Sequence, residues 1–128
     1  MAKAKYYDNK IIYLIAIWIG EYQVYKVGTT SRTALSRLKE IGAELMVQLG
    51  YWPKMKIMME HKHIETNYAV EAAILAETKE HVVKSYLCPE FSGRSELRAL
   101  EYDRLVDVYT RCLRGKYETV RVSEKVEL

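Results

Sequence analysis

The chain has 128 residues, of which 49% are hydrophobic, so it is long enough to bury one core and too short for two ordinary domains. A formal net charge of +3 at pH 7 excludes a strongly basic, histone-like binder. No apolar run approaches the roughly 20 residues of a membrane-spanning helix, and no hydrophobic segment follows the first charges as in a signal peptide. We therefore expect one cytoplasmic domain, residues 1–128, with no membrane partner.

The first predicted elements form a β-hairpin. Residues 11–18 are a nearly continuous apolar run, and residues 22–27 alternate aromatic or branched side chains with polar ones, which favours two strands. Gly20 and Glu21 suit the turn between them, because glycine adopts a positive φ without strain.

A short basic helix is predicted next. Residues 29–31 are of helix-capping types, and residues 32–41 have the leucine spacing of an amphipathic helix. Gly42 is the expected end of this helix, and residues 43–49 fit either a helix or a strand.

A third strand is predicted over residues 54–65. Their alternation places three side chains on one face and three on the other: Met55, Ile57 and Met59 against Lys54, Lys56 and Met58. A helix should then run from Thr66 or Asn67 to about Val83.

The last part of the chain is predicted to be mainly helical. Residues 85–93 contain proline and glycine and indicate a loop. Ser95 is the expected cap of a long helix to about Arg114, closed by Gly115, with an apolar stripe that begins at Leu97. The tail from Lys116 fits an edge strand or a loose extension.

Charge is concentrated at the N-terminal end. Residues 1–40 carry seven lysines and arginines against three acids, which indicates a positive field and a polyanionic partner.

Three short motifs in this region resemble the GIY-YIG nuclease superfamily. Ile11-Ile12-Tyr13 stands at the first motif, with Ile in place of Gly, and Lys26-Val27-Gly28 has the K-[IV]-G form of a phage-associated branch. Arg37, at the start of Arg-Leu-Lys-Glu-Ile, matches the family arginine. The resemblance covers about residues 10–100, and a C-terminal helix and tail occupy 95–128. It implies an α/β fold, more narrowly α+β, in which a small three-stranded antiparallel sheet is flanked by helices.

Glu71 is the most informative acidic residue. Its helical neighbours three and four positions away include Ile74 and Leu75, so its carboxylate lies on or beside an apolar face and must be paired, protonated or bound to a metal. A partly exposed glutamate that pairs with a lysine fits the pattern equally well. The resemblance implies that Glu71 holds one divalent cation, Mg²⁺ or Mn²⁺.

Tyr13 and Lys26 each allow two interpretations. By pattern alone Tyr13 is a core tyrosine and Lys26 an ordinary edge-strand lysine. The resemblance implies that Tyr13 lies near the scissile phosphate and activates the attacking water. Lys26, where many members have a second tyrosine, would then stabilise phosphate charge or join the base chemistry.

Several other residues are candidate phosphate contacts. The planar fork of Arg37 matches the oxygens of a phosphate, although a solvated arginine paired with Glu40 fits as well. Arg32 and Lys39 are further nucleic-acid-binding candidates.

Residues 91–97, Phe-Ser-Gly-Arg-Ser-Glu-Leu, resemble a late segment of the same branch. They make Glu96 and its neighbour Arg94 candidate additional site residues. A glutamate in the first turn of a helix is also favoured by the helix dipole alone.

Three groups of residues are set aside as sites. His61 and His63 share a strand face without further ligands and are expected at the surface. Cys88 and Cys112 lack metal-ligand spacing and are expected to be reduced, packed thiols. Trp18, Trp52 and the tyrosines could stack on bases, but most should lie in the core or at its rim.

The resemblance implies a metal-dependent DNA endonuclease that hydrolyses phosphodiester bonds through Tyr13, Lys26, Arg37 and Glu71. Whether the substrate is DNA or RNA, and whether the protein forms a homodimer, stay open. The alternative is a catalytically inactive GIY-YIG-like nucleic-acid-binding module, or a phage-encoded inhibitor that binds a host protein.

Overall fold

The computed structural model describes residues 11–62, 67–83, 96–116 and 126–127. Their strands form one antiparallel sheet with the order β4-β2-β1-β3-β5. Three strands of nine residues make its centre, and two strands of two residues extend it: β1 Ile11–Ile19, β2 Tyr22–Thr30, β3 Lys54–Lys62, β4 Leu97–Arg98 and β5 Val126–Glu127. The predicted α+β class is confirmed, and the three predicted strands are the centre of a wider sheet.

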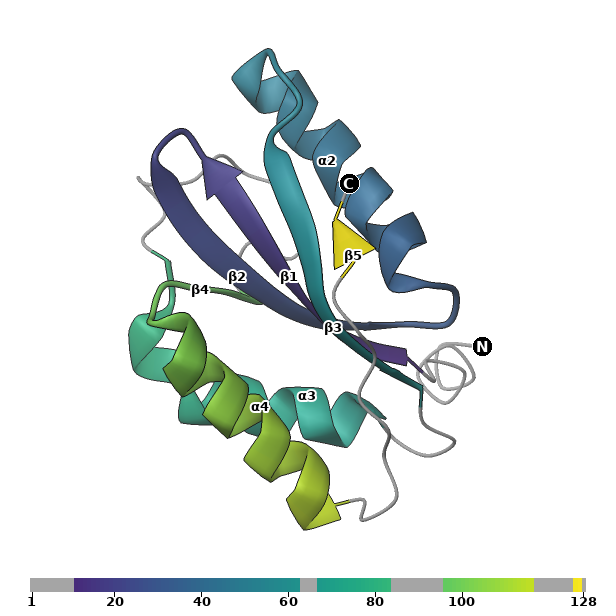
Figure 1. The fold of residues 1–128 in the computed structure, drawn as a ribbon, viewed down its shortest axis with the longest axis vertical. Helices are drawn as coiled ribbons and strands as arrows, with labels where there is room; N and C mark the ends of the chain where they lie inside the picture. Colours follow the sequence, from purple (N-terminus) through teal and green to yellow (C-terminus); the bar gives the residue numbers. More distant parts are fainter. Residues whose placement is uncertain (1–10, 63–66, 84–95, 117–125, 128) are drawn as a thin grey trace.

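Helices cover both faces of the sheet (Figure 1). Helix α2, Ala34–Leu49, packs on one face, and helices α3, Asn67–Glu77, and α4, Tyr102–Lys116, pack on the other. Alternate residues of β1 supply the two cores: Tyr13, Ile15 and Ile17 under α2, and Ile12, Leu14 and Ala16 under α3 and α4. None of the helices in the described ranges is long and apolar enough to cross a bilayer.

The predicted hairpin forms, but β2 continues past residue 27 to Thr30, so Thr29 and Thr30 belong to the strand and do not cap the next helix. Strands β1 and β2 pair without interruption from Ile11 opposite Thr30 to Ile19 opposite Tyr22. Gly20 in the turn has a φ of 64°, a left-handed conformation that glycine adopts at little cost.

Helix α2 is longer than predicted. Thr33 caps its start, where the Thr33 hydroxyl accepts a hydrogen bond from the Ser36 backbone N–H at 3.0 Å. The prediction that it ends at Gly42 is wrong, because the helix continues to Gly50, whose φ of 82° forms the C-cap. Gly42 has a packing role instead: a Cβ at this position would collide with the indole ring of Trp52.

A β-bulge in β3 overturns part of its predicted alternation. Leu14 of β1 lies opposite Met59 and Ile15 opposite Ile57, so one extra residue, Met58, is inserted between these pairs. Met59 therefore joins Met58 in the core under α3 and α4 instead of lying on the same face as Ile57. Every residue after the bulge is shifted to the opposite face from the one expected.

The bulge also buries His61, which the sequence predicted at the surface. Its Nδ1 lies 2.9 Å from the Tyr109 hydroxyl of α4, and that hydroxyl lies 3.3 Å from the carbonyl oxygen of Ile12. On the other face, the Glu60 carboxylate accepts a hydrogen bond from the backbone N–H of Ala34 at 2.7 Å. Two consecutive residues that follow the bulge, Glu60 and His61, thus tie β3 to both helical layers. The predictions for His63 and Cys88 lie outside the described residues, and Cys112 is half-buried, with its Sγ 3.6 Å from a carboxylate oxygen of Glu77.

The segment between α3 and α4 differs most from the prediction. Helix α3 ends at Glu77 and not near Val83, and a short 3₁₀ turn, η1 (Lys79–His81), follows. Leu97 and Arg98 are not helical but form β4, which pairs with β2. Their backbone is held from both sides, because the Val83 N–H also donates to the Leu97 carbonyl at 3.1 Å. These hydrogen bonds outweigh the helical spacing of the leucines.

Helix α4 consequently begins at Tyr102 rather than near Ser95, and it includes Gly115, which was expected to close it. At the opposite edge of the sheet, Val126 and Glu127 pair with β3. This pairing fits the edge-strand alternative for the end of the chain.

The Tyr109 hydroxyl should contribute measurably to stability. We expect Tyr109→Phe to lower the free energy of unfolding by about 1–3 kcal/mol, because a buried hydroxyl loses its contacts with His61 and Ile12. Guanidinium denaturation measures this change. Tyr51→Phe, at a tyrosine that is 48% exposed, is the control and should stay within about 0.5 kcal/mol of the wild type. Equal effects of the two substitutions would contradict the assigned contact.

Candidate active site

One pocket of about 400 Å³ opens beside β2, next to the short strand β4. The four predicted catalytic residues all line it: Tyr13 from β1, Lys26 from β2, Arg37 from α2 and Glu71 from α3. Glu96, immediately before β4, lines it as well. The chain thus brings together side chains from segments that are up to 83 positions apart in sequence.

The pairing of β1 with β2 sets the position of Tyr13. Tyr13 lies directly opposite Gly28, and a Cβ at Gly28 would collide with the hydroxyl and the ring of the tyrosine. The same Cβ would lie 3.0 Å from the Lys26 Nζ. Glycine is therefore required at position 28, because any larger residue would push the phenol or the ammonium group out of the pocket wall.

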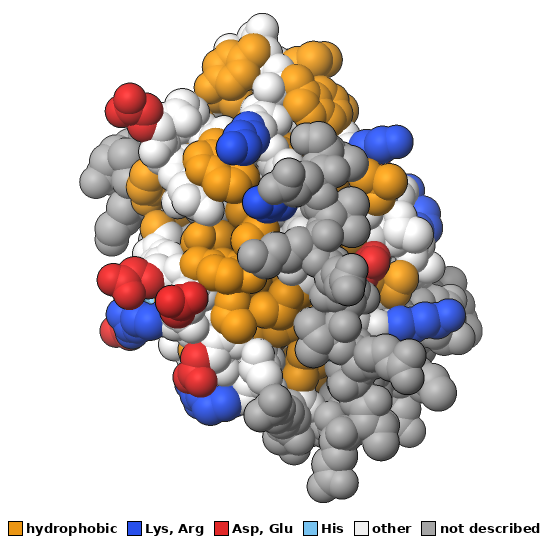
Figure 2. All heavy atoms as spheres, viewed as in Figure 1, with side chains coloured by type: hydrophobic (Ala, Val, Ile, Leu, Met, Phe, Trp, Pro, Cys, Tyr) orange, Lys and Arg blue, Asp and Glu red, His pale blue; other side chains and the backbone are white. Residues whose placement is uncertain are grey.

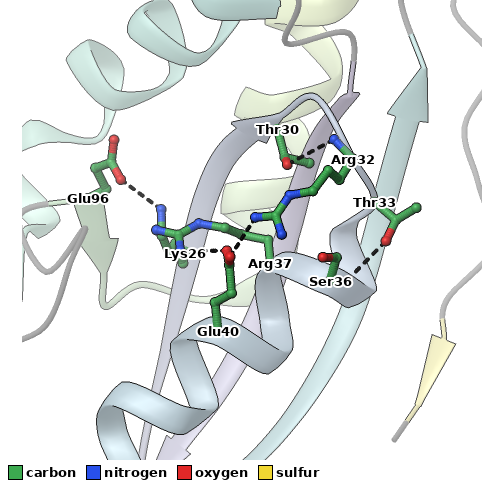
Figure 3. Close-up of polar contacts among 8 residues, drawn as sticks. All are labelled: Lys26, Thr30, Arg32, Thr33, Ser36, Arg37, Glu40 and Glu96. Atoms are coloured by element: carbon green, nitrogen blue, oxygen red, sulfur yellow. Dashed lines mark hydrogen bonds and ion pairs between the residues drawn. The ribbon is translucent and has the colours of Figure 1, made fainter. Parts of the chain in front are cut away.

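Lys26 is a buried cation with a defined partner. Its side chain is 2% exposed, and its Nζ lies 2.7 Å from a carboxylate oxygen of Glu96 (Figure 3). The ammonium group also lies 5.7 Å from the centre of the Tyr13 ring. A buried ammonium group is costly without a counter-charge, so Glu96 is what allows Lys26 to lie inside the pocket. Glu96 precedes a strand, and its predicted position in the first turn of a helix is wrong.

Arg37 interacts with Tyr13 on the pocket side and with Glu40 on the other side. Its Nη1 lies 3.2 Å from Glu40, and the other carboxylate oxygen of Glu40 lies 2.6 Å from Arg32 (Figure 3). Burial lowers the pKa of Arg37, but interactions with Tyr13 and Glu40 outweigh it, and the pKa is raised from its ordinary value. The guanidinium group is therefore charged and fixed in orientation.

The remaining predicted phosphate contacts are not pocket residues. Arg32 and Lys39 are exposed on the loop before α2 and on its first turns, and neither lines the pocket. Arg32 reaches the site only through Glu40. Arg94 lies outside the described residues.

Glu71 is nearly buried, with 7% of its surface exposed. The pKa of Glu71 is raised from 4.5 to about 7, mainly by burial and then by the charge of Glu96, against the lowering effects of Lys26 and a hydrogen bond with Thr29. The placement on an apolar helix face that the sequence indicated accounts for this burial. Near neutral pH this carboxyl group is therefore close to half protonated.

The atoms of the pocket that could coordinate a metal ion are carboxylate oxygens. Within the described ranges, no group of three or more histidines, cysteines, aspartates or glutamates is gathered around a common point. The pocket offers two carboxylates, Glu71 and Glu96, whose charges interact. A small oxygen-rich set fits Mg²⁺ or Mn²⁺, which retain several waters, better than zinc, which prefers nitrogen and sulfur ligands.

Sequence reasoning missed some of the pocket wall. Thr29, Ala72 and Leu75 line it, and none was a candidate. The K-V-G motif was a usable signal for Gly28, but the contact that requires glycine there depends on the strand register. The link from Arg32 through Glu40 to Arg37 had no signal beyond charge.

Comparison with known proteins adds nothing to this geometry: no family model, curated protein or solved structure matches the chain. The residues that line the pocket are therefore the main evidence on function.

The raised pKa of Glu71 predicts a dependence of stability on pH. The folded state keeps a proton that the unfolded chain releases above about pH 4.5, so this stabilisation is complete below pH 4.5 and is lost as the pH rises to about 7. The loss should reach about 3 kcal/mol. In EDTA, Glu71→Gln should therefore gain stability relative to the wild type between about pH 5 and about pH 8.

Denaturant unfolding across this pH range measures the difference. Glu77→Gln, which changes an exposed carboxylate on the same helix, is the matched control and should follow the wild type. A constant difference between wild type and Glu71→Gln at all pH values would rule out the shifted pKa.

Proposed function

We propose that the protein is a metal-dependent endonuclease that hydrolyses phosphodiester bonds of DNA, as its resemblance to the GIY-YIG superfamily implies. The observation that carries the proposal is the convergence of Tyr13, Lys26, Arg37 and Glu71 on one pocket. Two fixed cations and a buried carboxyl group are more than a core needs, and they match the charges of a phosphodiester and a divalent cation.

Each side chain has a distinct task under this proposal. Glu71, with Glu96 beside it, would hold Mg²⁺ or Mn²⁺, and such an ion supplies charge stabilisation at the leaving oxygen. Arg37 would bind the non-bridging oxygens through its planar fork, for which the contact with Glu40 already orients it. Tyr13 would position and help to deprotonate the attacking water.

Lys26 is better suited to stabilise negative charge than to act as a general base. Its ammonium group is held at 2.7 Å by the carboxylate of Glu96, and it lies beside the ring of Tyr13. A cation in this position favours the negative charge that develops on the phosphate during hydrolysis.

Plasmid nicking tests the proposal. Supercoiled DNA should be nicked in Mg²⁺ or Mn²⁺ but not in EDTA. Arg37→Ala and Glu71→Gln should each lower the rate by about 10²-fold or more, because each removes charge stabilisation made in the transition state. Arg111→Ala, at an exposed arginine of α4 that pairs with Asp107, is the matched control and should cleave at the wild-type rate.

Two outcomes would overturn the catalytic proposal. Cleavage that survives both Arg37→Ala and Glu71→Gln would come from a contaminating nuclease. Absence of cleavage with salt-sensitive DNA binding would favour the inactive nucleic-acid-binding module instead, and absence of both would favour a protein partner.

Cation binding can be tested without activity. At a Mn²⁺ concentration about ten times its dissociation constant, the folded state gains about 1.4 kcal/mol, so the melting temperature should rise by roughly 3–6 °C. Glu71→Gln should lose this rise, and Glu77→Gln should keep it because its carboxylate is exposed and outside the pocket. An equal rise in wild type and Glu71→Gln would remove Glu71 from the cation site.

A further inference from the structure

A second surface lies on the face of the sheet opposite to the side chains of Tyr13 and Lys26. Tyr25 and Lys26 are neighbours on β2, so their side chains point to opposite faces: Lys26 lines the pocket, whereas Tyr25 packs in the core under α3 and α4. Beyond the start of α4 this second face continues toward the hairpin turn. Figure 2 shows hydrophobic side chains gathered in the middle of the view, with Lys and Arg side chains bordering them above.

The strand register identifies the residues of this surface. Trp18 lies opposite Lys54 of β3, and Ala16 lies opposite both Tyr25 and Lys56. Tyr102, the first residue of α4, packs against Tyr25 with ring centroids 5.8 Å apart. We call the set Trp18, Tyr25, Tyr102, Lys54 and Lys56 the Trp18 platform.

Two of the three aromatic rings of the platform are only partly covered, whereas Tyr25 is buried. Trp18 and Tyr102 are partly buried at the margin of the core, and Lys54 is exposed, with its Nζ 4.7 Å from the centre of the Trp18 ring. A cation–π contact at an exposed site is weaker than the stacking of a nucleic-acid base on an aromatic ring. A base can therefore replace the ammonium group on Trp18 while Lys54 turns to a phosphate.

Charge favours a polyanion over an apolar protein partner at the β3 side of the platform. Lys54 and Lys56 project there from alternate positions of β3, and the charge of Lys56 reaches the Tyr102 hydroxyl, where it lowers the pKa that burial and Asp103 raise. Glu127 lies opposite Lys56, and Asp103 lies on α4 beside Tyr102. Lys54 precedes Lys56 by two positions and lies outside the pairing with β5. It is therefore the main cation that the platform offers to a phosphate.

We propose that the Trp18 platform binds single-stranded nucleic acid, with bases stacked on Trp18 and Tyr102 and phosphates held by Lys54 and Lys56. Aromatic rings bordered by cations are the combination that binds unpaired strands without reading their sequence, since every base has a face that can stack. None of the platform residues lines the pocket, so this binding goes beyond the proposed hydrolysis and does not depend on it.

Tryptophan fluorescence tests this proposal directly. The chain has two tryptophans, so Trp18 is the only one left in Trp52→Phe. In EDTA and low salt, a short oligothymidylate should quench this fluorescence to saturation. The corresponding duplex should bind about tenfold more weakly, because its bases are already stacked, and inorganic polyphosphate, which has no bases, should not quench.

Variants separate stacking from folding and from the pocket. Anisotropy of a labelled oligothymidylate should show about tenfold weaker binding for Trp18→Ala and nearly full binding for Trp18→Phe, which keeps a ring. Lys54→Ala should weaken binding severalfold and reduce the salt dependence by about one phosphate contact, whereas Lys79→Ala, at an exposed lysine of η1, should not. Glu77→Gln, at an exposed carboxylate of α3 outside both the pocket and the platform, should bind as the wild type does.

Absence of quenching would overturn the proposal, and so would unchanged binding by Trp18→Ala or equal quenching by polyphosphate. Binding that Arg37→Ala removes and Trp18→Ala leaves unchanged would move the nucleic-acid contact to the pocket and would overturn the platform as well. Failure of DNA cleavage with intact quenching would overturn the proposed hydrolysis alone.

Discussion

The close approach of the Tyr13 phenol to the backbone of Gly28 is the constraint on which the pocket depends. Tyr13 is fully buried at the centre of the sheet, so its ring has no room to move aside. Its hydroxyl reaches the pocket wall only because position 28 lacks a Cβ. The uninterrupted register of β1 and β2 then brings Lys26, two residues before Gly28, to the same face of the sheet.

Buried charge around this constraint is difficult to explain by stability alone. Lys26 and Glu71 are both nearly removed from solvent, and Glu96 neutralises the first while it raises the pKa of the second. Replacing buried ion pairs by packed apolar residues is often neutral or stabilising. A protein that needed only a core would therefore not be expected to keep four ionisable side chains and a phenol around one pocket, and ligand binding is the simpler reason for their presence.

The sequence predicted the elements whose hydrophobic period is regular, and it failed where backbone contacts between distant segments decide the structure. The hairpin follows from alternation and from Gly20. Leu97 has helical spacing with the leucines after it, yet it forms β4, because β2 on one side and Val83 on the other offer its backbone hydrogen bonds. No pattern within residues 95–114 contains those partners.

The bulge at Met58 is a similar case. A strand's two faces are predictable only while the alternation holds, and one inserted residue reversed the expected directions of Met59 and His61. Gly42 is a further example, in a helix. The local sequence predicted a C-cap, but the glycine is needed because Trp52 packs against it from outside the helix. Motifs marked Tyr13, Lys26 and Arg37, and helical spacing marked Glu71, so these pocket residues were accessible from the sequence. The pair of Arg37 with Glu40 was one of the alternatives for Arg37, whereas the contact of Arg32 with the same carboxylate had no signal beyond charge.

The alternation of β2 gives the protein two surfaces of different chemistry from consecutive residues. Lys26 is turned to a pocket with two carboxyl groups, and Tyr25 is turned to the aromatic platform. Aromatic stacking tolerates any base and contributes affinity without sequence readout. Hydrolysis of a phosphodiester instead requires that the nucleic-acid backbone be held in a fixed position relative to the catalytic groups. The proposed strand binding and the proposed hydrolysis would therefore use side chains that point to opposite sides of β2, and a substitution on one side should leave the chemistry of the other unchanged.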